Sequence, residues 1–169
     1  LGGPQSTPGW AEWAARARRG EGAKTGADRR TYGPIKGGKA TYLAGVSRGK
    51  ESVGLDLKAP ADRDIFERLL DKGDAVVENF RPGTMEKLGY GWDSLHPRYP
   101  RLIYAAASGF GHTGPFSHYP SYDMVVQGLG GIMSITGTPG GDLVRVGTSV
   151  GDLAGGLYTA IALNAAFLH

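Results

Sequence analysis

The apolar positions of this 169-residue chain are gathered into runs that alternate with glycine-rich and polar segments. The longest run covers residues 153–168, where the only polar side chains are Thr159, Asn164 and the phenol of Tyr158. Its larger side chains keep helical spacing, and a helix that is apolar all round is typical of a protein interior. The pattern therefore predicts a buried helix that starts at Asp152.

The apolar segments between residues 52 and 107 alternate in type, as they do in α/β domains. Apolar and polar positions first alternate with the period of a strand. After Pro60 the apolar positions recur with the period of a helix, and short apolar runs follow. The predicted elements are a strand at 52–57, a helix at 61–72, a strand at 75–78, single helical turns at 84–88 and 92–95, and a strand at 101–107. Strands alternating with helices indicate a mostly parallel sheet.

A loop rich in Gly and Pro follows at residues 108–121, at the end of a strand, where open α/β sheets place their ligand sites. The stretch 122–133 has helical spacing, although three of its positions are glycines. Each glycine costs a helix up to about 1 kcal/mol relative to Ala, so we expect another backbone to pack closely there. Residues 136–147 predict turns.

The first fifty residues show little periodicity. Residues 18–50 are basic and glycine-rich and predict a loop with a short extended piece at 40–43. Residues 1–50 carry ten Lys and Arg against three Asp and Glu, whereas residues 51–169 carry nine against thirteen. A basic segment of this kind suits a phosphate-bearing partner, and a solvated basic tail is the simpler alternative.

Composition narrows the chemistry. The chain has 29 glycines spread between hydrophobic runs, which indicates many tight turns. It has no cysteine, which excludes disulfides, zinc–thiolate sites and cysteine nucleophiles and fits a cytoplasmic protein. No signal peptide is visible, and the run at 153–168 is shorter than the roughly 20 residues of a membrane span. We expect no membrane contact. A truncated membrane span remains an alternative because the run at 153–168 reaches the end of the chain, which stops inside a helical pattern. The chain also starts with Leu.

Two stretches carry candidate chemistry. Asp152 lies at a helix start, where the helix dipole favours an ionised carboxylate that can serve as a nucleophile or a base. The simpler interpretation of that stretch alone is an N-cap. In the segment 78–83 (ENFRPG), Asn79, Phe80 and Arg81 together suit a nucleotide, and Phe80 packed into the core is an equal alternative.

Other common motifs are missing from the sequence. There is no strict GxGxxG, no Walker pattern and no GxSxG. His112 and His118 share one loop, but no third ligand is spaced to complete a metal site, so we predict no metal. Few aromatic residues are interleaved with the basic residues of the first fifty, so we predict no nucleic-acid partner.

Four consecutive motifs carry a family resemblance. They are ENFRPGTMEKLG, PRLIYAAASGFGHTGP, YDMVVQGLGGIMSITG and VRVGTSVGDLAGGLYTAI, and SRGKESVGLDLK precedes them. In this order and spacing they resemble the class III CoA-transferases, the family of formyl-CoA transferase, crotonobetainyl-CoA:carnitine CoA-transferase and α-methylacyl-CoA racemase. The resemblance covers residues 18–169. It implies an α/β fold: a partial, truncated Rossmann-like large domain with a mostly parallel sheet.

The resemblance implies a catalytic aspartate at Asp152. In the family this carboxylate attacks an acyl-CoA thioester to give a mixed anhydride, and the CoA thiolate then forms an aspartyl-CoA thioester. CoA finally passes to an acceptor acid. The implied activity is that of an acyl-CoA:carboxylate CoA-transferase whose partners are acyl-CoA and a small carboxylic acid. Full-length relatives form interlocked homodimers.

The family's coenzyme A contacts are carried over by position. The matching residues lie near the adenine and 3′-phosphate, in the ENFRPG segment, and along the pantetheine path. They are Arg18, Leu55 and Lys58; Asn79, Phe80, Arg81 and Lys87; and Tyr119, Pro120, Ser121 and Tyr122.

One position separates the branches of the family. Racemases have a His-Asp pair about 30 residues before the aspartate, and here the pair is Tyr122-Asp123. A phenol is poorly suited to removing an α-proton at neutral pH, which favours a transferase. A racemase-like enzyme and an inactive CoA-binding fragment remain the alternatives. Residues 1–17 depart from the family pattern, which predicts a disordered or mis-framed segment, and relatives are more than twice as long, which predicts a fragment.

Overall fold

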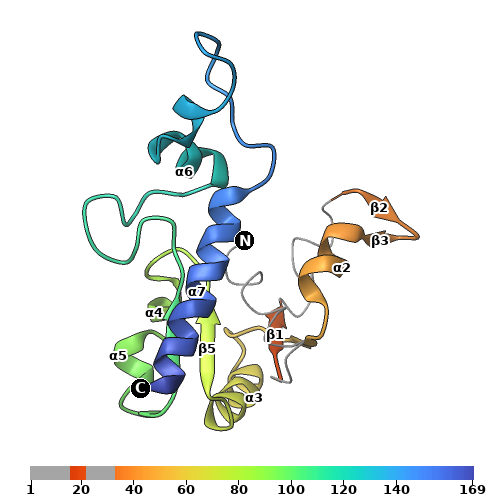
Figure 1. Cartoon of the computed structure of the whole chain (residues 1–169). Helices are drawn as coiled ribbons and strands as arrows, with labels where there is room; N and C mark the ends of the chain where they lie inside the picture. The colour runs from red at the N-terminus through yellow and green to blue at the C-terminus, as the bar shows by residue number, and fades with distance from the viewer. Residues whose placement is uncertain (1–15, 22–32) are drawn as a thin grey trace.

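The computed structural model describes residues 16–21 and 33–169. The elements in chain order (Figure 1) are β1 (Arg18–Glu21), β2 (Ile35–Lys36), β3 (Lys39–Ala40), α2 (Thr41–Ser47), β4 (Glu51–Gly54), α3 (Pro60–Asp71), β5 (Ala75–Glu78), α4 (Thr84–Leu88), α5 (Trp92–Leu95), β6 (Ile103–Ala106), α6 (Asp123–Leu129), the 3-10 helix η2 (Ile132–Ile135) and α7 (Val150–Leu168). Apart from residues 16 and 17, the segment predicted at 1–17 lies outside the described residues.

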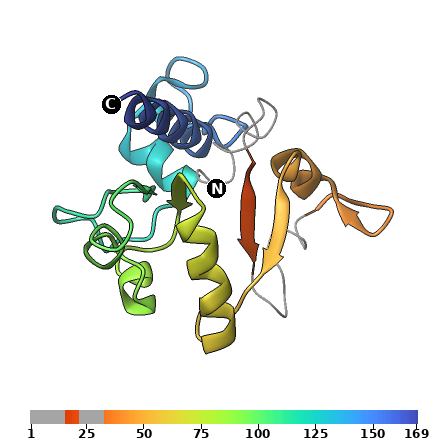
Figure 2. The same ribbon diagram turned by 90° about the horizontal axis from the view of Figure 1, so that it is seen from below.

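The described strands form three pairs. β1 runs parallel to β4, and β5 runs parallel to β6 with Ala75 opposite Ile103 and Glu78 opposite Ala106. The short β2 and β3 form an antiparallel hairpin. Figure 2 shows β1 and β4 side by side, with α3 leading away from them toward β5. The α/β class and the parallel pairing are thus confirmed.

The elements between residues 52 and 107 follow the sequence pattern closely. The strand at 75–78 and the helical turns at 84–88 and 92–95 are confirmed at their predicted bounds. The predicted helix at 61–72 starts one residue earlier, with Pro60 in its first turn, and the strand at 101–107 is trimmed at both ends. The strand predicted at 52–57 is shorter than expected, because the pairing with β1 ends at Gly54.

The best packed core lies among α3, α4, α5 and the start of β6. Its buried side chains are Leu70, Met85, Tyr90, Leu95 and Leu102. The rings of Phe66 and Tyr90 meet edge to face at 4.8 Å, a favourable aromatic geometry. This core supports the two strands from which the candidate site begins.

The prediction of a loop over residues 18–50 is wrong for the residues that the structure describes. Gly37 and Gly38 have φ values of 57° and 72°, which fits a tight two-residue turn between β2 and β3. Residues 41–43, predicted to be extended, are helical because α2 starts at Thr41, whose backbone N–H and hydroxyl both donate to the Pro34 carbonyl. Strands of two residues are too short to leave a periodic signal.

The helix predicted at 122–133 is broken by its glycines. α6 ends at Leu129, and Gly131 adopts a φ of 78°, the left-handed conformation that terminates helices. A Cβ at Gly130 would lie 2.9 Å from the Val126 carbonyl oxygen of the preceding turn. These glycines therefore end the helix, and the expectation that they admit another backbone is wrong.

The prediction that the helix at 153–168 is buried is also wrong for this chain. α7 packs mainly against α6 and β6, and only Gly156 and Leu163 are buried along it. Leu157 is 67% exposed and Ile161 60% exposed. A helix that is apolar all round needs neighbours on every face, and the exposed Leu157 and Ile161 show that part of the α7 surface has none.

α7 also extends beyond the apolar run from which it was predicted. Its 19 residues are long and apolar enough to cross a membrane by length and composition, and 11% of its most apolar window is buried. A core helix of a soluble protein meets the same two criteria, so the absence of a membrane contact stays a prediction.

Candidate functional site

The carboxyl ends of β5 and β6 form one edge, and the candidate site lies along it. The Asn79 side-chain amide, just after β5, donates to the Ala107 carbonyl, just after β6, at 2.5 Å. α7 runs opposite to β5, so its N-terminus and α6 both lie toward this edge (Figure 1). Ligand sites of open α/β sheets occupy the same place.

Glu78 is a buried carboxylate at this edge, with only 6% of its surface exposed. It accepts a hydrogen bond from the Phe80 backbone N–H at 2.6 Å and one from the Tyr104 hydroxyl at 3.3 Å, and His112 Nε2 lies 3.8 Å away. Burial, and then the charge of Glu78, raise the pKa of Tyr104. Glu78 thus fixes the turn after β5. Sequence reasoning missed it, although a glutamate that ends an apolar run is a recognisable signal.

After the buried Glu78, the ENFRPG segment presents Asn79, Phe80 and Arg81 at the surface. Phe80 is 52% exposed, so the alternative that it packs into the core is wrong. Arg81 is exposed, and its carbonyl accepts the Thr84 N–H at 3.0 Å where α4 begins. Lys87 is exposed on α4. A half-exposed aromatic ring can stack on a base, and an exposed guanidinium next to it in the sequence can pair with a phosphate.

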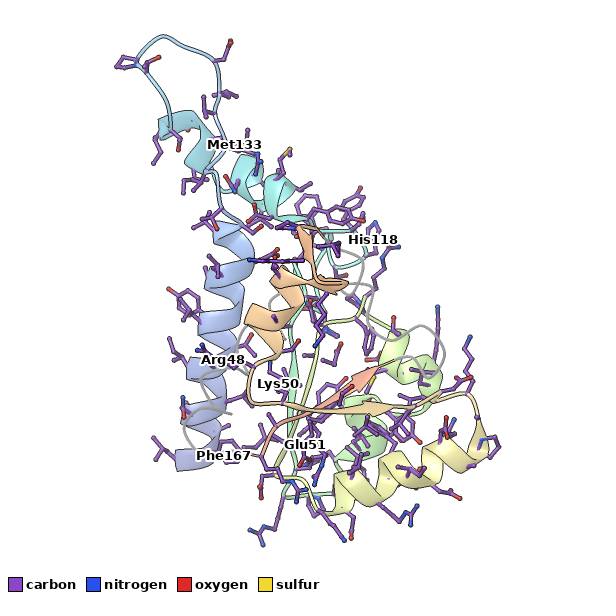
Figure 3. The ribbon with its side chains drawn as sticks, turned by 90° about the vertical axis from the view of Figure 1, so that its right-hand side faces the viewer. Arg48, Lys50, Glu51, His118, Met133 and Phe167 are labelled. Carbon is purple, nitrogen blue, oxygen red and sulfur yellow. The ribbon has the colours of Figure 1, made fainter. Side chains whose placement is uncertain are left out.

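The three contacts expected near the adenine and 3′-phosphate, Arg18, Leu55 and Lys58, lie on the β1–β4 side of the molecule (Figure 2). Arg18 Nε donates to Glu51 (Figure 3) at 2.9 Å, so its guanidinium already has an acidic partner. A hydrogen bond from Arg16 is the main cause that lowers the pKa of Glu51. Leu55 is 8% exposed and therefore part of the interior, whereas Lys58 is exposed.

The loop at 108–121 is drawn together at its base. A Cβ at Gly109 would lie 1.9 Å from the Cβ of Ser121, so the loop closes there only because residue 109 is glycine. Tyr119 is 53% exposed and contacts the ring of Phe116 at 5.7 Å, and Pro120 is also exposed. His118 lies beside Tyr119 on this loop (Figure 3). Tyr122, 70% exposed, ends the segment at the start of α6.

Asp152 lies in the first turn of α7, half-buried. The N-cap position belongs to Ser149, so the interpretation of Asp152 as the N-cap is wrong. The Asp123 carboxylate, from α6, accepts the Gly151 backbone N–H at 2.8 Å instead. Asp152 therefore lies in the positive field of the helix N-terminus without acting as its cap.

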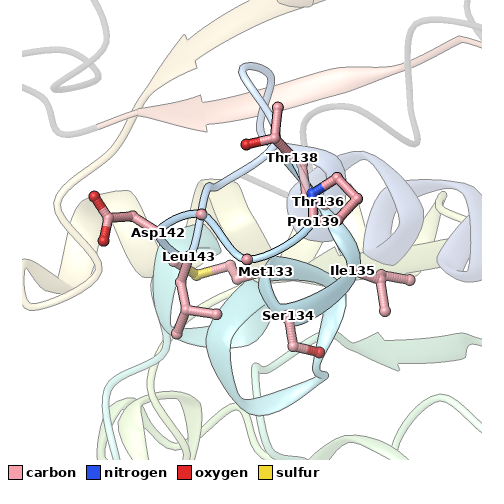
Figure 4. Close-up of a pocket in the computed structure, with 11 residues that line it drawn as sticks. Met133, Ser134, Ile135, Thr136, Thr138, Pro139, Asp142 and Leu143 are labelled. Carbon is pink, nitrogen blue, oxygen red and sulfur yellow. The ribbon is translucent and has the colours of Figure 1, made fainter.

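A separate pocket lies in the turn that follows η2 (Figure 4). Residues 133–143 line it, and none of the predicted site residues is among them. Within residues 16–21 and 33–169, no group of three or more His, Cys, Asp or Glu side chains is placed to hold a metal ion. The absence of a metal stays a prediction.

Comparison with known proteins identifies the family to which this chain is similar. Residues 19–169 match the family model described as "CoA-transferase family III". The chain is 48% identical over 159 residues to acetyl-CoA:oxalate CoA-transferase of Acetobacter aceti, covering 94% of this chain and 41% of that protein. It is 36% identical over 176 residues to succinate–glutarate CoA-transferase of Agrobacterium fabrum, covering 100% and 44%.

Solved structures agree. A CAIB/BAIF family protein from Brucella suis matches with a TM-score of 0.94 and 36% identity, covering 99% of this chain and 46% of that one. A hypothetical protein from Mycobacterium tuberculosis matches with a TM-score of 0.88 and 37% identity, covering 100% and 47%. The chain therefore spans less than half the length of these relatives.

Proposed function

Because the chain belongs to CoA-transferase family III, we propose that it carries the nucleophile and part of the coenzyme A site of an acyl-CoA:carboxylate CoA-transferase. The observation that carries the proposal is the place of Asp152, half-buried in the first turn of α7. The matching relatives are named for oxalate and glutarate. A small dicarboxylic acid is accordingly the proposed acceptor.

The proposed reaction proceeds by covalent catalysis at Asp152. Its carboxylate attacks the thioester carbonyl of the donor, the C–S bond breaks, and a mixed anhydride and CoA thiolate result. The thiolate then attacks the aspartyl carbonyl and releases the donor acid, which leaves an aspartyl-CoA thioester. The acceptor carboxylate attacks this thioester and expels the CoA thiolate, which gives a second mixed anhydride between Asp152 and the acceptor. The thiolate then attacks the acceptor carbonyl of this anhydride, which forms the product acyl-CoA and frees the Asp152 carboxylate.

The surroundings of Asp152 suit this chemistry. The helix N-terminus favours the ionised carboxylate that the first step requires. Backbone N–H groups of the loop 147–149, which leads into α7, would stabilise the oxyanions that form at each attack.

For the coenzyme, the proposal assigns the Phe80 ring to the adenine and Arg81 to a phosphate. Phe80 is half-exposed and Arg81 exposed at the carboxyl edge of β5, which supports these roles. Asn79, Lys87 and the segment 119–122 would complete the path toward Asp152. Arg18, Leu55 and Lys58 lie on β1 and near β4, so their contribution requires the two strand pairs to belong to one Rossmann-like sheet.

The resemblance supports two further proposals about the whole protein, a cytoplasmic location and an interlocked homodimer. A racemase is the less favoured activity. Tyr122 stands where racemases have their histidine, and a neutral phenol is a poor base for an α-proton.

The test is to trap the aspartyl intermediate. The chain is incubated with acetyl-CoA or succinyl-CoA, treated with hydroxylamine or borohydride, and the modified residue is located by mass spectrometry. We expect modification at Asp152, none in Asp152→Asn, and undiminished modification in Asp142→Asn, which changes an exposed acid of the 133–143 turn in the same way.

Other outcomes separate the alternatives. No modification, with CoA still raising the melting temperature, would replace the transferase proposal by an inactive CoA-binding fragment. If Asp152 is not modified and CoA does not raise the melting temperature either, both proposals for this chain are contradicted.

A further inference from the structure

Gln127 is a fully buried polar side chain of α6 that contacts the loop leading into α7. It is 1% exposed, and Glu78 is the other buried polar or charged residue among those that the structure describes. Its Oε1 accepts the Val146 backbone N–H at 2.7 Å. Its Nε2 donates to Asp123 Oδ2 at 2.6 Å and to the Thr148 carbonyl at 3.3 Å. One side chain of α6 thus holds the loop that leads into α7 at two points.

Asp123 extends this contact to the helix itself. While its Oδ2 is held by Gln127, its Oδ1 accepts the Gly151 N–H at 2.8 Å. Gly151 is the second residue of α7, and the N-cap residue Ser149 makes no capping bond with its side chain. Asp123 therefore supplies the cap that Ser149 does not, and it does so from another helix.

Close packing reinforces these bonds. A Cβ at Gly151 would lie 3.1 Å from Val126 Cγ1 and 3.2 Å from Asp123 Oδ1. The starts of α6 and α7 therefore touch, and a small shift of either helix would stretch the Asp123 bond. A buried hydrogen-bond network that is fully paired gives one well-defined arrangement.

We infer that Gln127, through Asp123, is a positioning residue that fixes the first turn of α7 and with it the direction of the Asp152 carboxylate. Asp152 directly follows Gly151, the residue that Asp123 holds. The benefit for the reaction rests on the proposed function, because a nucleophile must approach its carbonyl along one narrow path. The hold on the helix start does not depend on the reaction.

The test uses two variants and a matched control. Gln127→Glu keeps the shape but removes the N–H donors that face Asp123 and Thr148, and Gln127→Met removes every polar bond at a similar volume. Asn164→Asp makes the same amide-to-acid change far along α7, where the Asn164 amide donates to the Ala160 carbonyl of its own helix. Two quantities are measured, namely backbone amide exchange at Gly151 by NMR and the acylation rate of Asp152 over a range of acyl-CoA concentrations.

In both Gln127 variants we expect faster exchange at Gly151, with β6 amides unchanged. The maximal acylation rate should fall at least about tenfold, while the half-saturating acyl-CoA concentration stays the same. Asn164→Asp should match the wild type in both measurements. A lowered rate together with a raised half-saturating concentration and faster exchange in β6 would mean general loosening and would overturn the inference.

The remaining outcomes test the two parts of the inference separately. Unchanged exchange at Gly151 overturns the hold on the helix start, and faster exchange with an unchanged rate overturns its role in the reaction. If wild-type Asp152 is not acylated at all, the proposed function fails, and the exchange at Gly151 alone still confirms or rejects the hold of Gln127.

Discussion

Two apolar regions of this chain differ in how far their large side chains are buried. Between residues 60 and 107, large apolar side chains close around one another, and Tyr90 and Leu95 are 0% and 1% exposed. Along α7 the chain is at least as apolar, yet Leu157 and Ile161 remain 67% and 60% exposed. α3 has one apolar face, and its partners follow within forty residues. α7 is apolar on all faces, and α6 and β6 make its main contacts among the elements that the structure describes.

Equal truncations should therefore have unequal effects in the two regions. Leu95→Ala removes a fully buried side chain from α5 and should lower the free energy of unfolding by about 2.7–5 kcal/mol. Leu157→Ala removes a side chain that already faces solvent and should change it by no more than about 0.5 kcal/mol. Urea unfolding followed by circular dichroism measures both. A large loss in Leu157→Ala would mean that α7 is covered in solution and would break the comparison.

The same contrast explains what the sequence could predict of the fold. Elements whose partners lie nearby, such as β5 and α4, were found at their bounds because period, caps and packing agree locally. The pairing of Arg18 with Glu51 joins residues 33 positions apart on two strands, and no local sequence pattern predicts it. The exposure of α7 could not be predicted either, because its hydrophobicity indicates a need for packing partners but not whether this chain provides them.

The candidate site shows a similar division. The place of Asp152 near a helix start followed from the end of a polar loop and the start of an apolar run, and the family resemblance assigned its role. That Asp123 caps α7 in its place depends on a bond between residues 28 apart in the chain. The position of Glu78 at the end of an apolar run is visible in the sequence, but only the fold shows that it is buried and that it accepts hydrogen bonds from the Phe80 N–H and the Tyr104 hydroxyl.

Glycine substitutions should sharpen the comparison with changes of opposite sign. Gly109→Ala places a Cβ 1.9 Å from that of Ser121 and should destabilise the chain by about 1–3 kcal/mol through overpacking. Gly155→Ala, on the open side of α7 with nothing within 4 Å of the new Cβ, should stabilise it by up to about 1 kcal/mol. Thermal unfolding of both variants gives the sign.

A rescue separates crowding at Gly109 from other causes. Adding Ser121→Gly to Gly109→Ala removes the colliding Cβ and should restore most of the lost stability. If the double variant is no more stable than Gly109→Ala, the loss does not arise from the closure of the 108–121 loop.

The smallest expected effect concerns how the packed region responds to pH. Burial, and then the Glu78 carboxylate, raise the pKa of Tyr104, so the native state keeps a proton that the unfolded chain releases near pH 10. The stability that depends on this proton is complete below pH 10 and declines as the pH rises above it. Tyr104→Phe should remove part of that alkaline decline, whereas Tyr158→Phe, on the exposed side of α7, should leave it as in the wild type. Urea midpoints at pH 8 and pH 11 measure the difference, and an equal decline in both variants would show that Tyr104 is no more enclosed than Tyr158.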